Sequence, residues 1–257
     1  MTDRSKMKRS RAQKKSDDAL SLLVIMPSYN EADNLPSAVL DIRNNLTDTD
    51  ILVIDDGSID ETAKVARDLG CRLLRLPFNV GIGGAVQAGY KFADEKGYSY
   101  AVQFDGDGQH SAASLPKMVE VARGGSWDLV IGSRYLEVNE YHTPFARRMG
   151  MVIFSRIVSM VIRQKITDST SGFRVLSKRA IEFCAMNYPS DYPEVEVIPQ
   201  LHFAGLTITE VPADMKERES GRSSITWSRA IYYMVKVVLA ISISLLREKP
   251  IKRKEVA

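Results

Sequence analysis

The chain has 257 residues, of which 44% are hydrophobic and 26% charged, and its formal net charge at pH 7 is +3. This length suits one α/β domain with a full core and short additions, and it argues against two independent domains. The two cysteines, Cys71 and Cys184, lack the spacing of a metal or redox site, so we expect reduced core residues in a cytosolic protein.

Residues 1–19 are rich in lysine and arginine and contain no apolar stretch, which excludes a signal peptide or a membrane span there. We expect a disordered, solvated basic tail. The alternative is attraction to anionic lipid, worth roughly 1 kcal/mol per basic residue near the surface. No aromatic residues are interleaved with the basic ones and no nucleic-acid module follows, so we expect no nucleic-acid partner.

From residue 20 to 135, short apolar runs alternate with stretches of helical period, which predicts βαβ units and a mostly parallel sheet. The continuous apolar run at 22–26 favours strands covered on both faces. The predicted strands are 22–26, 51–54, 72–76, 100–104 and 129–132. The predicted helices between them are 31–46, 60–69, 82–96 and 114–123.

Beyond residue 135 we predict a helix at 144–163, a polar loop at 168–172, two shorter helices and a strand at 206–211. The last apolar segment, 231–246, is too short for an untilted span of roughly 30 Å of hydrocarbon. Its basic residues share one face, so it predicts an amphipathic helix that either packs on the core or lies in a membrane interface. Arg156 and Arg163 repeat this pattern in the preceding helix, which favours a membrane surface.

Polar clusters follow the predicted strands at 27–31, 55–58, 105–109 and 133–135. Ligands of open α/β sheets bind at the carboxyl ends of the strands, so all four clusters are expected on one binding edge. The spacing Asp105-x-Asp107-x-Gln109 places three oxygen-bearing side chains after a buried strand, and Mg²⁺ or Mn²⁺ prefers such ligands. Alone the pattern is often a turn, but beside the other clusters it predicts a metal site.

Asp55 and Asp56 have two interpretations: a helix cap completed by Ser58 or Asp60, or carboxylates that bind a nucleobase or ribose. Tyr29 offers a ring on which a base could stack. The glycine-rich stretch 79–84 is not a dinucleotide fingerprint and predicts close backbone packing beside the nucleotide.

The polar clusters described above, taken in chain order, resemble the motifs of family 2 glycosyltransferases. They resemble most of all those of the polyprenyl-phosphate, dolichol-phosphate mannosyltransferase-like branch. The resemblance covers residues 20 to about 225 and implies a GT-A fold, a Rossmann-like mostly parallel sheet flanked by helices. The amphipathic helix and a basic tail, expected from their own residues, follow at 226–257. The motifs that carry it are Pro27-Ser28-Tyr29-Asn30-Glu31, Val53-Ile54-Asp55-Asp56-Gly57-Ser58, Asn79-x-Gly81-x-Gly83, Asp105-Gly106-Asp107-Gly108-Gln109-His110, Gly132-Ser133-Arg134-Tyr135 and Asp168-x-x-Ser171-Gly172-Phe173-Arg174.

The resemblance also implies roles for individual residues. The metal that bridges to the donor diphosphate would be held by Asp105, Asp107 and Gln109, and Asp107 and Arg134 would be catalytic. Arg134 and Ser171 would meet the acceptor phosphate. The nucleotide would be held by Pro27, Tyr29, Glu31, Asp55 and Asp56, and a flexible loop would close on the diphosphate through Arg218 and Arg222.

The implied reaction is a single displacement with inversion, in which Mg²⁺ or Mn²⁺ and an arginine stabilise charge on the departing nucleoside diphosphate. A polyprenyl phosphate acceptor is already anionic and needs no base. A saccharide hydroxyl, the alternative acceptor, would need one, and Glu194 or Glu196 is the candidate. A third hypothesis is a non-catalytic nucleotide-binding subunit that recruits a partner to the membrane.

Two features depart from the family pattern. Many polyprenyl-phosphate relatives carry two transmembrane helices after the catalytic domain, whereas this chain shows one short amphipathic segment. We therefore expect peripheral attachment to the cytoplasmic face of the cell membrane, either directly or through a small membrane protein. Tyr192-Pro193-Glu194 is similar to bacterial cell-envelope polysaccharide enzymes, which favours a UDP-sugar donor over GDP-mannose, and undecaprenyl phosphate as the acceptor.

Overall fold

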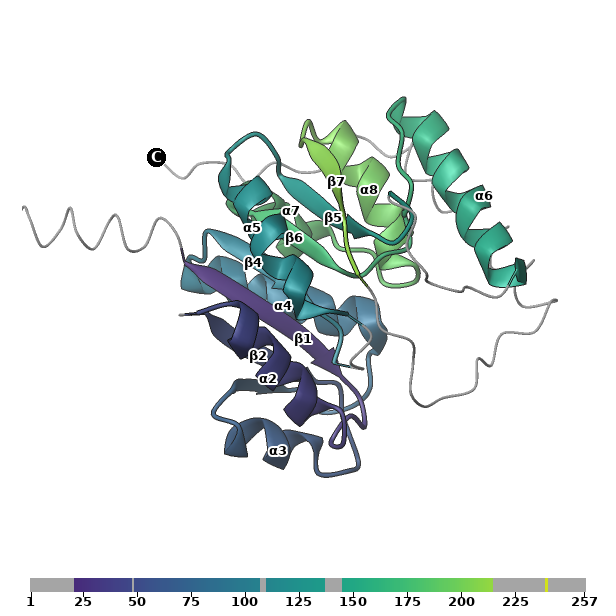
Figure 1. The fold of residues 1–257 in the computed structure, drawn as a ribbon. Helices are drawn as coiled ribbons and strands as arrows, with labels where there is room; N and C mark the ends of the chain where they lie inside the picture. The colour runs from purple at the N-terminus through teal and green to yellow at the C-terminus, as the bar shows by residue number, and fades with distance from the viewer. Residues whose placement is uncertain (1–20, 48, 107–109, 137–144, 215–238, 240–257) are drawn as a thin grey trace, which may run out of the picture.

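A seven-stranded sheet flanked by helices forms the centre of the computed structural model (Figure 1). The structure describes residues 21–47, 49–106, 110–136, 145–214 and 239. The strand order is β3-β2-β1-β4-β6-β5-β7. The strands are β1 Leu22–Ser28, β2 Asp50–Asp55, β3 Arg72–Arg75, β4 Tyr100–Gln103, β5 Leu129–Ser133, β6 Arg174–Ser177 and β7 Ile208–Pro212.

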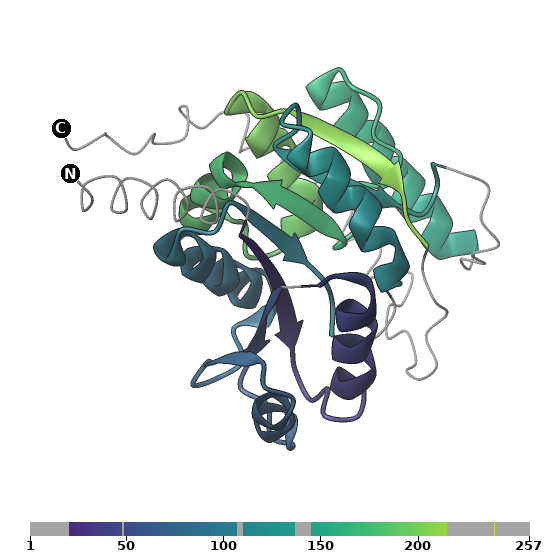
Figure 2. The same cartoon turned by 60° about the vertical axis from the view of Figure 1, so that its left-hand side comes forward.

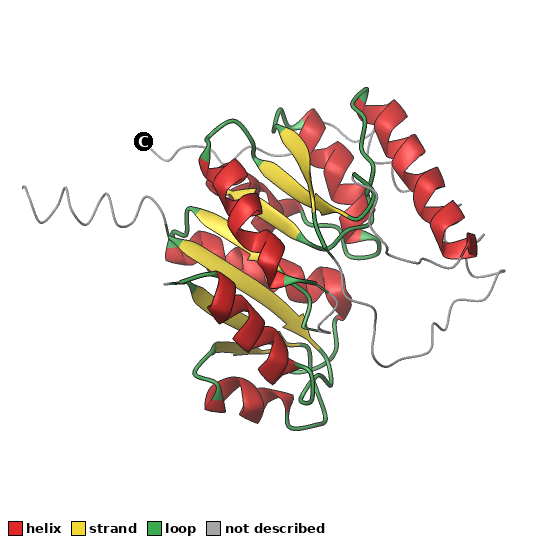
Figure 3. Cartoon of the chain, in the orientation of Figure 1, coloured by secondary structure: helices red, strands yellow, loops and turns green. Residues whose placement is uncertain are grey.

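Helices occupy most of the segments between the strands (Figure 3). They are α2 Leu35–Asn45, α3 Thr62–Asp68, α4 Gly81–Lys96, the short 3₁₀ helix η2 Ala112–Ser114, α5 Leu115–Arg123, α6 Phe145–Ile162, α7 Lys178–Asn187 and α8 Pro193–Phe203. The prediction of an α/β fold with a mostly parallel sheet flanked by helices is confirmed. The segment 231–246 lies outside the described residues except for Leu239, which is helical and exposed.

Both faces of the sheet are covered, as the apolar run of β1 predicts. Leu23 and Ile25 point into a core built with α4, α6, α7 and α8, whereas Val24 and Met26 point into a second core built with α2 and α5. Figure 2 shows α4 and α2 on opposite sides of β1. Side chains alternate between the faces of a strand, so a strand with a core on each side must be apolar throughout.

The pairing of the strands brings the site's loops together. β1 is parallel to β2 and β4, and β5 is parallel to β7. β6 runs antiparallel between β4 and β5, so β4 and β5 point the same way. The carboxyl ends of β1, β2, β4 and β5 therefore lie at one edge, together with the amino end of β6.

One strand was missed by the sequence analysis: residues 174–177 were expected to belong to the region of a loop and two helices, and they form β6. Its sequence, Arg-Val-Leu-Ser, has only two apolar residues between polar ends, too short a pattern to show strand periodicity. The neighbouring strands supply the stability, since Arg174 pairs with Gln103 of β4 and Ile131 of β5. No helix within the described ranges is long and apolar enough to cross a bilayer.

Candidate functional site

The loops after β1 and β2 form the part of the sheet edge where a nucleotide is expected to bind. Tyr29 is 46% exposed, so its ring is available for stacking, whereas Pro27 is a buried residue of β1. The backbone N–H of Glu31 donates to Thr62 Oγ1 at 2.9 Å, and its carboxylate accepts from Asn34 Nδ2 at 2.6 Å. These contacts fix the β1 loop against the start of α3.

Asp56 ties the glycine-rich turn to the end of β2. Its Oδ1 accepts from the N–H of Val80 at 2.8 Å, and its Oδ2 accepts from the N–H of Gly81 at 3.0 Å. The side chain is nearly buried, and each carboxylate oxygen can accept more than one hydrogen bond. Asp56 therefore orders the turn at the start of α4, and a role toward a ribose or base stays a prediction.

Asp55 holds the turn after β2, and its expected contact with substrate stays a prediction. Its side chain is fully buried; Oδ1 accepts from the N–H of Ser58 at 2.9 Å, and Oδ2 lies 3.1 Å from Arg75 Nε. A carboxylate enclosed in this way serves to fix the turn after β2. Of the two capping residues that the helix-cap interpretation offers, Asp60 accepts from the N–H of Thr62, the first residue of α3, at 3.0 Å.

The glycine-rich turn is packed closely, as the sequence predicts. A Cβ at Gly83 would lie 2.6 Å from the carbonyl oxygens of both Pro189 and Ser190, so α4 approaches the turn after α7 without room for a side chain. Gly57 combines a φ of 73° with a Cβ position 2.7 Å from the carbonyl carbon of Phe78. Both glycines are therefore required by the backbone geometry.

Gly83→Ala is expected to destabilise the fold by about 1–3 kcal/mol, because the new methyl group forces backbone movement in a packed region. Gly150→Ala is the matched control: Gly150 lies in α6, and a Cβ there would meet nothing within 4 Å. Urea unfolding of both variants measures the difference. Equal midpoints for Gly83→Ala and wild type would contradict the packing account.

Asp105 lies just after β4, at the predicted metal position. Its N–H donates to His110 Nδ1 at 3.1 Å, and the His110 ring stacks on Phe173 with centroids 4.8 Å apart. The Asp105 side chain is 32% exposed, and a Cβ at Gly172 would lie 3.0 Å from its Oδ2. Glycine thus leaves open the space beside this carboxylate.

The described part of the metal site fits a hard divalent cation, because Asp105 offers carboxylate oxygens at the open edge of the sheet. Asp107 and Gln109 lie outside the described residues, and so do Arg218 and Arg222. Within the described ranges, no group of three or more His, Cys, Asp or Glu side chains could hold a metal ion. The complete ligand set therefore stays a prediction.

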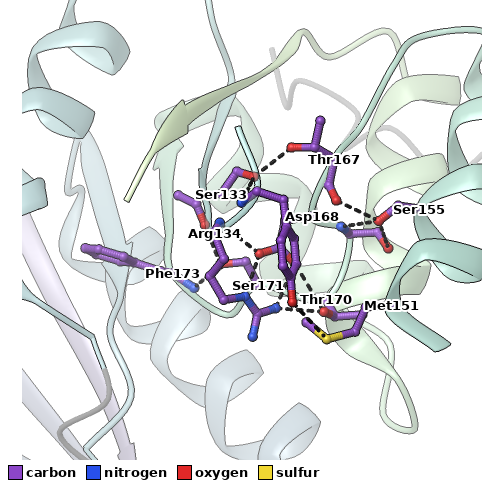
Figure 4. A network of polar contacts seen from close by, with 12 residues as sticks. Ser133, Arg134, Met151, Ser155, Thr167, Asp168, Thr170, Ser171 and Phe173 are labelled. Atoms are coloured by element: carbon purple, nitrogen blue, oxygen red, sulfur yellow. Dashed lines mark hydrogen bonds and ion pairs between the residues drawn. The ribbon is translucent and has the colours of Figure 1, made fainter. Parts of the chain in front are cut away.

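Arg134 is held by Asp168 in a two-pronged ion pair (Figure 4). Arg134 Nε lies 2.6 Å from Asp168 Oδ2, and Nη2 lies 2.7 Å from Oδ1. Nη2 also donates to Thr170 Oγ1 at 2.8 Å, and the backbone N–H of Arg134 donates to Asp168 Oδ2 at 3.1 Å. Asp168 is fully buried while 11% of the Arg134 side chain stays exposed, so the guanidinium reaches the surface in a fixed orientation.

Ser171 does not face the site as the resemblance implied. Its side chain is 1% exposed; the hydroxyl donates to the carbonyl of Gly132 at 2.7 Å and accepts from the N–H of Phe173 at 3.2 Å. A hydroxyl used in this way joins the 168–173 loop to β5. In this structure Ser171 supports the loop, and contact with an acceptor phosphate would require the loop to open.

A buried polar cluster lies beneath Asp105, and the sequence analysis did not identify it as a unit. Gln103 Oε1 accepts from the hydroxyls of Tyr90 and Tyr188, each at 3.2 Å. Arg174 donates to the carbonyls of Ser171 at 2.7 Å, Ser169 at 3.2 Å and Glu194 at 2.6 Å. The sequence does contain a signal for this cluster: Gln103 and Arg174 are polar residues beside short apolar runs, and buried polar side chains need hydrogen-bond partners.

Glu194 borders this cluster, in the first turn of α8. Burial raises the pKa of Glu194; the Arg174 guanidinium opposes the rise, and the Asp105 carboxylate adds to it. Glu196 is also nearly buried, at 8% exposed.

Comparisons with known proteins show which family the chain resembles. The model of the family described as glycosyl transferase family 2 matches residues 23–184. An undecaprenyl-phosphate mannosyltransferase of Micrococcus luteus is 32% identical over 216 residues, covering 80% of this chain and 88% of the relative. A polyprenol monophosphomannose synthase of Mycolicibacterium smegmatis is 29% identical over 225 residues, covering 84% of each chain.

Among solved structures, glucosyl-3-phosphoglycerate synthase of Mycobacterium tuberculosis, crystallised with Mn²⁺, UDP-glucose and phosphoglyceric acid, superposes with a TM-score of 0.67. The alignment covers 92% of this chain and 83% of that one at 15% identity. At this identity the likeness establishes the fold.

Proposed function

The chain belongs to glycosyl transferase family 2, and on this basis we propose that it moves one sugar from a nucleotide-sugar donor to a polyprenyl phosphate. The observation that carries the proposal is the single sheet edge that gathers the exposed Tyr29 ring, the Asp105 carboxylate and the oriented Arg134 guanidinium. The relatives from Micrococcus luteus and Mycolicibacterium smegmatis, both named for lipid-phosphate mannosylation, support this acceptor class.

At the donor end, Tyr29 stacks on the base, while Asp56 keeps the glycine-rich turn close to the nucleotide. Asp105, with Asp107 and Gln109, would hold Mg²⁺ or Mn²⁺. When bound, such a cation neutralises negative charge on the departing diphosphate. Asp105 stays oriented because its backbone and carboxylate both contact His110, whose ring is fixed against Phe173.

At the acceptor end, Arg134 offers a guanidinium whose direction Asp168 fixes, so an incoming phosphate meets a donor already in place. A lipid phosphate carries its negative charge near neutral pH and attacks the anomeric carbon without losing a proton. The reaction then needs no general base, and a single displacement inverts the configuration of the sugar.

The competing acceptor is a saccharide hydroxyl, and the observation that favours it is the place of Glu194, whose backbone carbonyl accepts from Arg174 in the buried cluster beneath Asp105. A hydroxyl needs a base, and a carboxyl group with a raised pKa suits that role. For a lipid phosphate acceptor we expect Glu194→Gln to change kcat less than about 10-fold, with no new dependence on pH. A loss of about 10²-fold or more, in a wild-type enzyme whose rate falls as the pH drops through the Glu194 pKa, would establish Glu194 as a base.

Helix α6 supports attachment at a membrane surface. It stands at the outer edge of the molecule and packs against α8 (Figure 1). Apolar and basic side chains alternate on its exposed face and directly after its end: Val152, Arg156 and Met160, which is 71% exposed, lie on the helix, and Arg163 follows it. A cavity of about 680 Å³ opens beside them, and residues 145–166 contain no acidic side chain. We propose that this face rests on the anionic headgroups of the cytoplasmic leaflet.

Replacing Arg156 and Arg163 together by glutamate is expected to weaken binding to anionic liposomes by at least about 2 kcal/mol, roughly 30-fold, because two attractive charges are lost and two repulsive ones are added. Flotation with vesicles containing phosphatidylglycerol measures the change. The matched control reverses two exposed lysines elsewhere, Lys64 on α3 and Lys178 on α7. Equal losses for both pairs would show attraction by net charge alone and remove α6 from the account.

The proposed function is tested with a panel of UDP- and GDP-sugars, each offered undecaprenyl phosphate and an oligosaccharide acceptor in detergent with Mn²⁺ or Mg²⁺. We expect one donor to label the lipid phosphate and the oligosaccharide to stay unlabelled. Labelling of the oligosaccharide alone would select the hydroxyl acceptor.

A further inference from the structure

Glu210, on strand β7, holds the loop that carries Asp168. Its Oε1 accepts from the backbone N–H of Asp168 at 2.8 Å. Its Oε2 accepts from the backbone N–H of Thr167 at 2.7 Å and from the Thr167 hydroxyl at 3.0 Å. Three hydrogen bonds from two consecutive residues make this carboxylate a clamp on the backbone of the loop.

The clamp lies directly behind the Arg134 ion pair. Asp168, whose N–H is held by Glu210, directs its carboxylate to Nε and Nη2 of Arg134. Thr167 also connects the loop to β5, because its hydroxyl lies 2.6 Å from the hydroxyl of Ser133, the residue before Arg134 (Figure 4). The β7 carboxylate is therefore connected to Arg134 through its side-chain partner and through the adjoining backbone.

A purely structural acceptor would not need this residue type. Glu210 is partly buried next to a second carboxylate, and burial raises its pKa, with the charge of Asp168 adding to the rise. Two acids side by side are unfavourable unless hydrogen bonds and a cation compensate. The three donors from Thr167 and Asp168 supply the first compensation, and Arg134 supplies the second.

We propose that Glu210 is a positioning residue for the acceptor: by fixing the backbone of Thr167 and Asp168, it sets the direction in which Arg134 presents its guanidinium to the acceptor phosphate. This inference rests on the proposed function. A bidentate pair restrains a guanidinium within its plane, so a small rotation of Asp168 would turn Arg134 with it. Among the described residues, the hydrogen bonds of Glu210 run to Thr167 and Asp168 at the acceptor end, so we expect its effect on binding of the acceptor.

The test is Glu210→Gln, which keeps the size of the side chain but replaces one accepting oxygen by an NH₂ group that cannot accept a hydrogen bond. We expect KM for undecaprenyl phosphate to rise about 10-fold, while KM for the nucleotide sugar and kcat stay within about twofold. Glu182→Gln, the same change on the exposed surface of α7, is the matched control and should alter neither KM.

A double variant tests the route of the effect. If Glu210 acts through Arg134, adding Glu210→Gln to Arg134→Lys should leave KM for the lipid phosphate within about twofold of Arg134→Lys alone. Multiplication of the two effects would overturn the proposal. So would unchanged KM values together with a lower kcat per total protein, because a structural defect only reduces the folded fraction.

Thr167→Val provides a milder variant should Glu210→Gln fold poorly. It removes the hydroxyl contacts to Glu210 and Ser133 while leaving both backbone hydrogen bonds to Glu210. We expect a smaller rise in the same KM, and no rise would count against the clamp. The wild-type assay tests the proposed function separately. If the wild type does not transfer sugar to the lipid phosphate, both the proposed acceptor and the inference are wrong. If the wild type does, but Glu210→Gln leaves KM for the lipid phosphate unchanged, only the inference is wrong.

Discussion

Asp105→Asn is expected to lower kcat/KM for sugar transfer by about 10²-fold or more. The variant keeps the size of the side chain and removes the negative charge at the carboxyl end of β4, where the cation and the diphosphate are proposed to meet. Its space beside Gly172 is unchanged, so the fold should stay intact. Initial rates at several Mn²⁺ concentrations measure the effect, and excess metal should recover part of the activity.

Asp68→Asn is the control, because it makes the same chemical change at an exposed position of α3. It should retain full activity, and both variants should melt within a few degrees of wild type. Wild-type rates for Asp105→Asn would remove Asp105 from the metal site.

Arg174→Met is expected to destabilise the protein by about 3–5 kcal/mol, since it removes the charge that compensates a buried carboxyl group. Arg174 is 1% exposed, and its guanidinium satisfies the carbonyls of Ser169, Ser171 and Glu194. Methionine fills similar volume but offers no donor, so these carbonyls lose their partner. The same change should raise the pKa of Glu194 further, because the guanidinium now opposes that rise.

Arg179→Met is the matched control. Arg179 pairs with Asp128 at 2.9 Å, but its side chain is 65% exposed, and such surface pairs contribute roughly 0–1 kcal/mol. Chemical unfolding of both variants gives the comparison. A loss for Arg174→Met no larger than that for Arg179→Met would show that the buried cluster beneath Asp105 does not hold the loop.

Much of the fold was predictable from the sequence, because its strands are apolar runs with a core on each face. β1 is the clearest case: Leu23 and Val24 point into different cores, and no polar residue interrupts the apolar run at 22–26. The strand β6 was not predicted, for the opposite reason. Arg174 and Ser177 flank only two apolar residues, and the strand exists because β4 and β5 pair with it on both sides.

The site was predictable where a residue type and its spacing carry the chemistry. Asp105 was singled out because Asp105-x-Asp107-x-Gln109 stands beside other polar clusters at the strand ends, whereas the role of Arg134 came from the resemblance, and both roles stay predictions. Asp55 and Ser171 turn inward and hold loops, which a sequence does not show, and their contact with substrate stays a prediction. Glu210 was missed because one acid in a strand carries no pattern, and its partners are some 40 positions away in the sequence.

The most direct measurement of the central claim is the identity and configuration of the product made by the wild-type enzyme from undecaprenyl phosphate. We predict one sugar per lipid phosphate, extracted into organic solvent, released by mild acid and opposite to the donor in anomeric configuration by NMR. Its formation should stop on chelation and resume with Mn²⁺. Retention of the donor's configuration, or label found only on a saccharide hydroxyl, would contradict a single inverting displacement by a lipid phosphate.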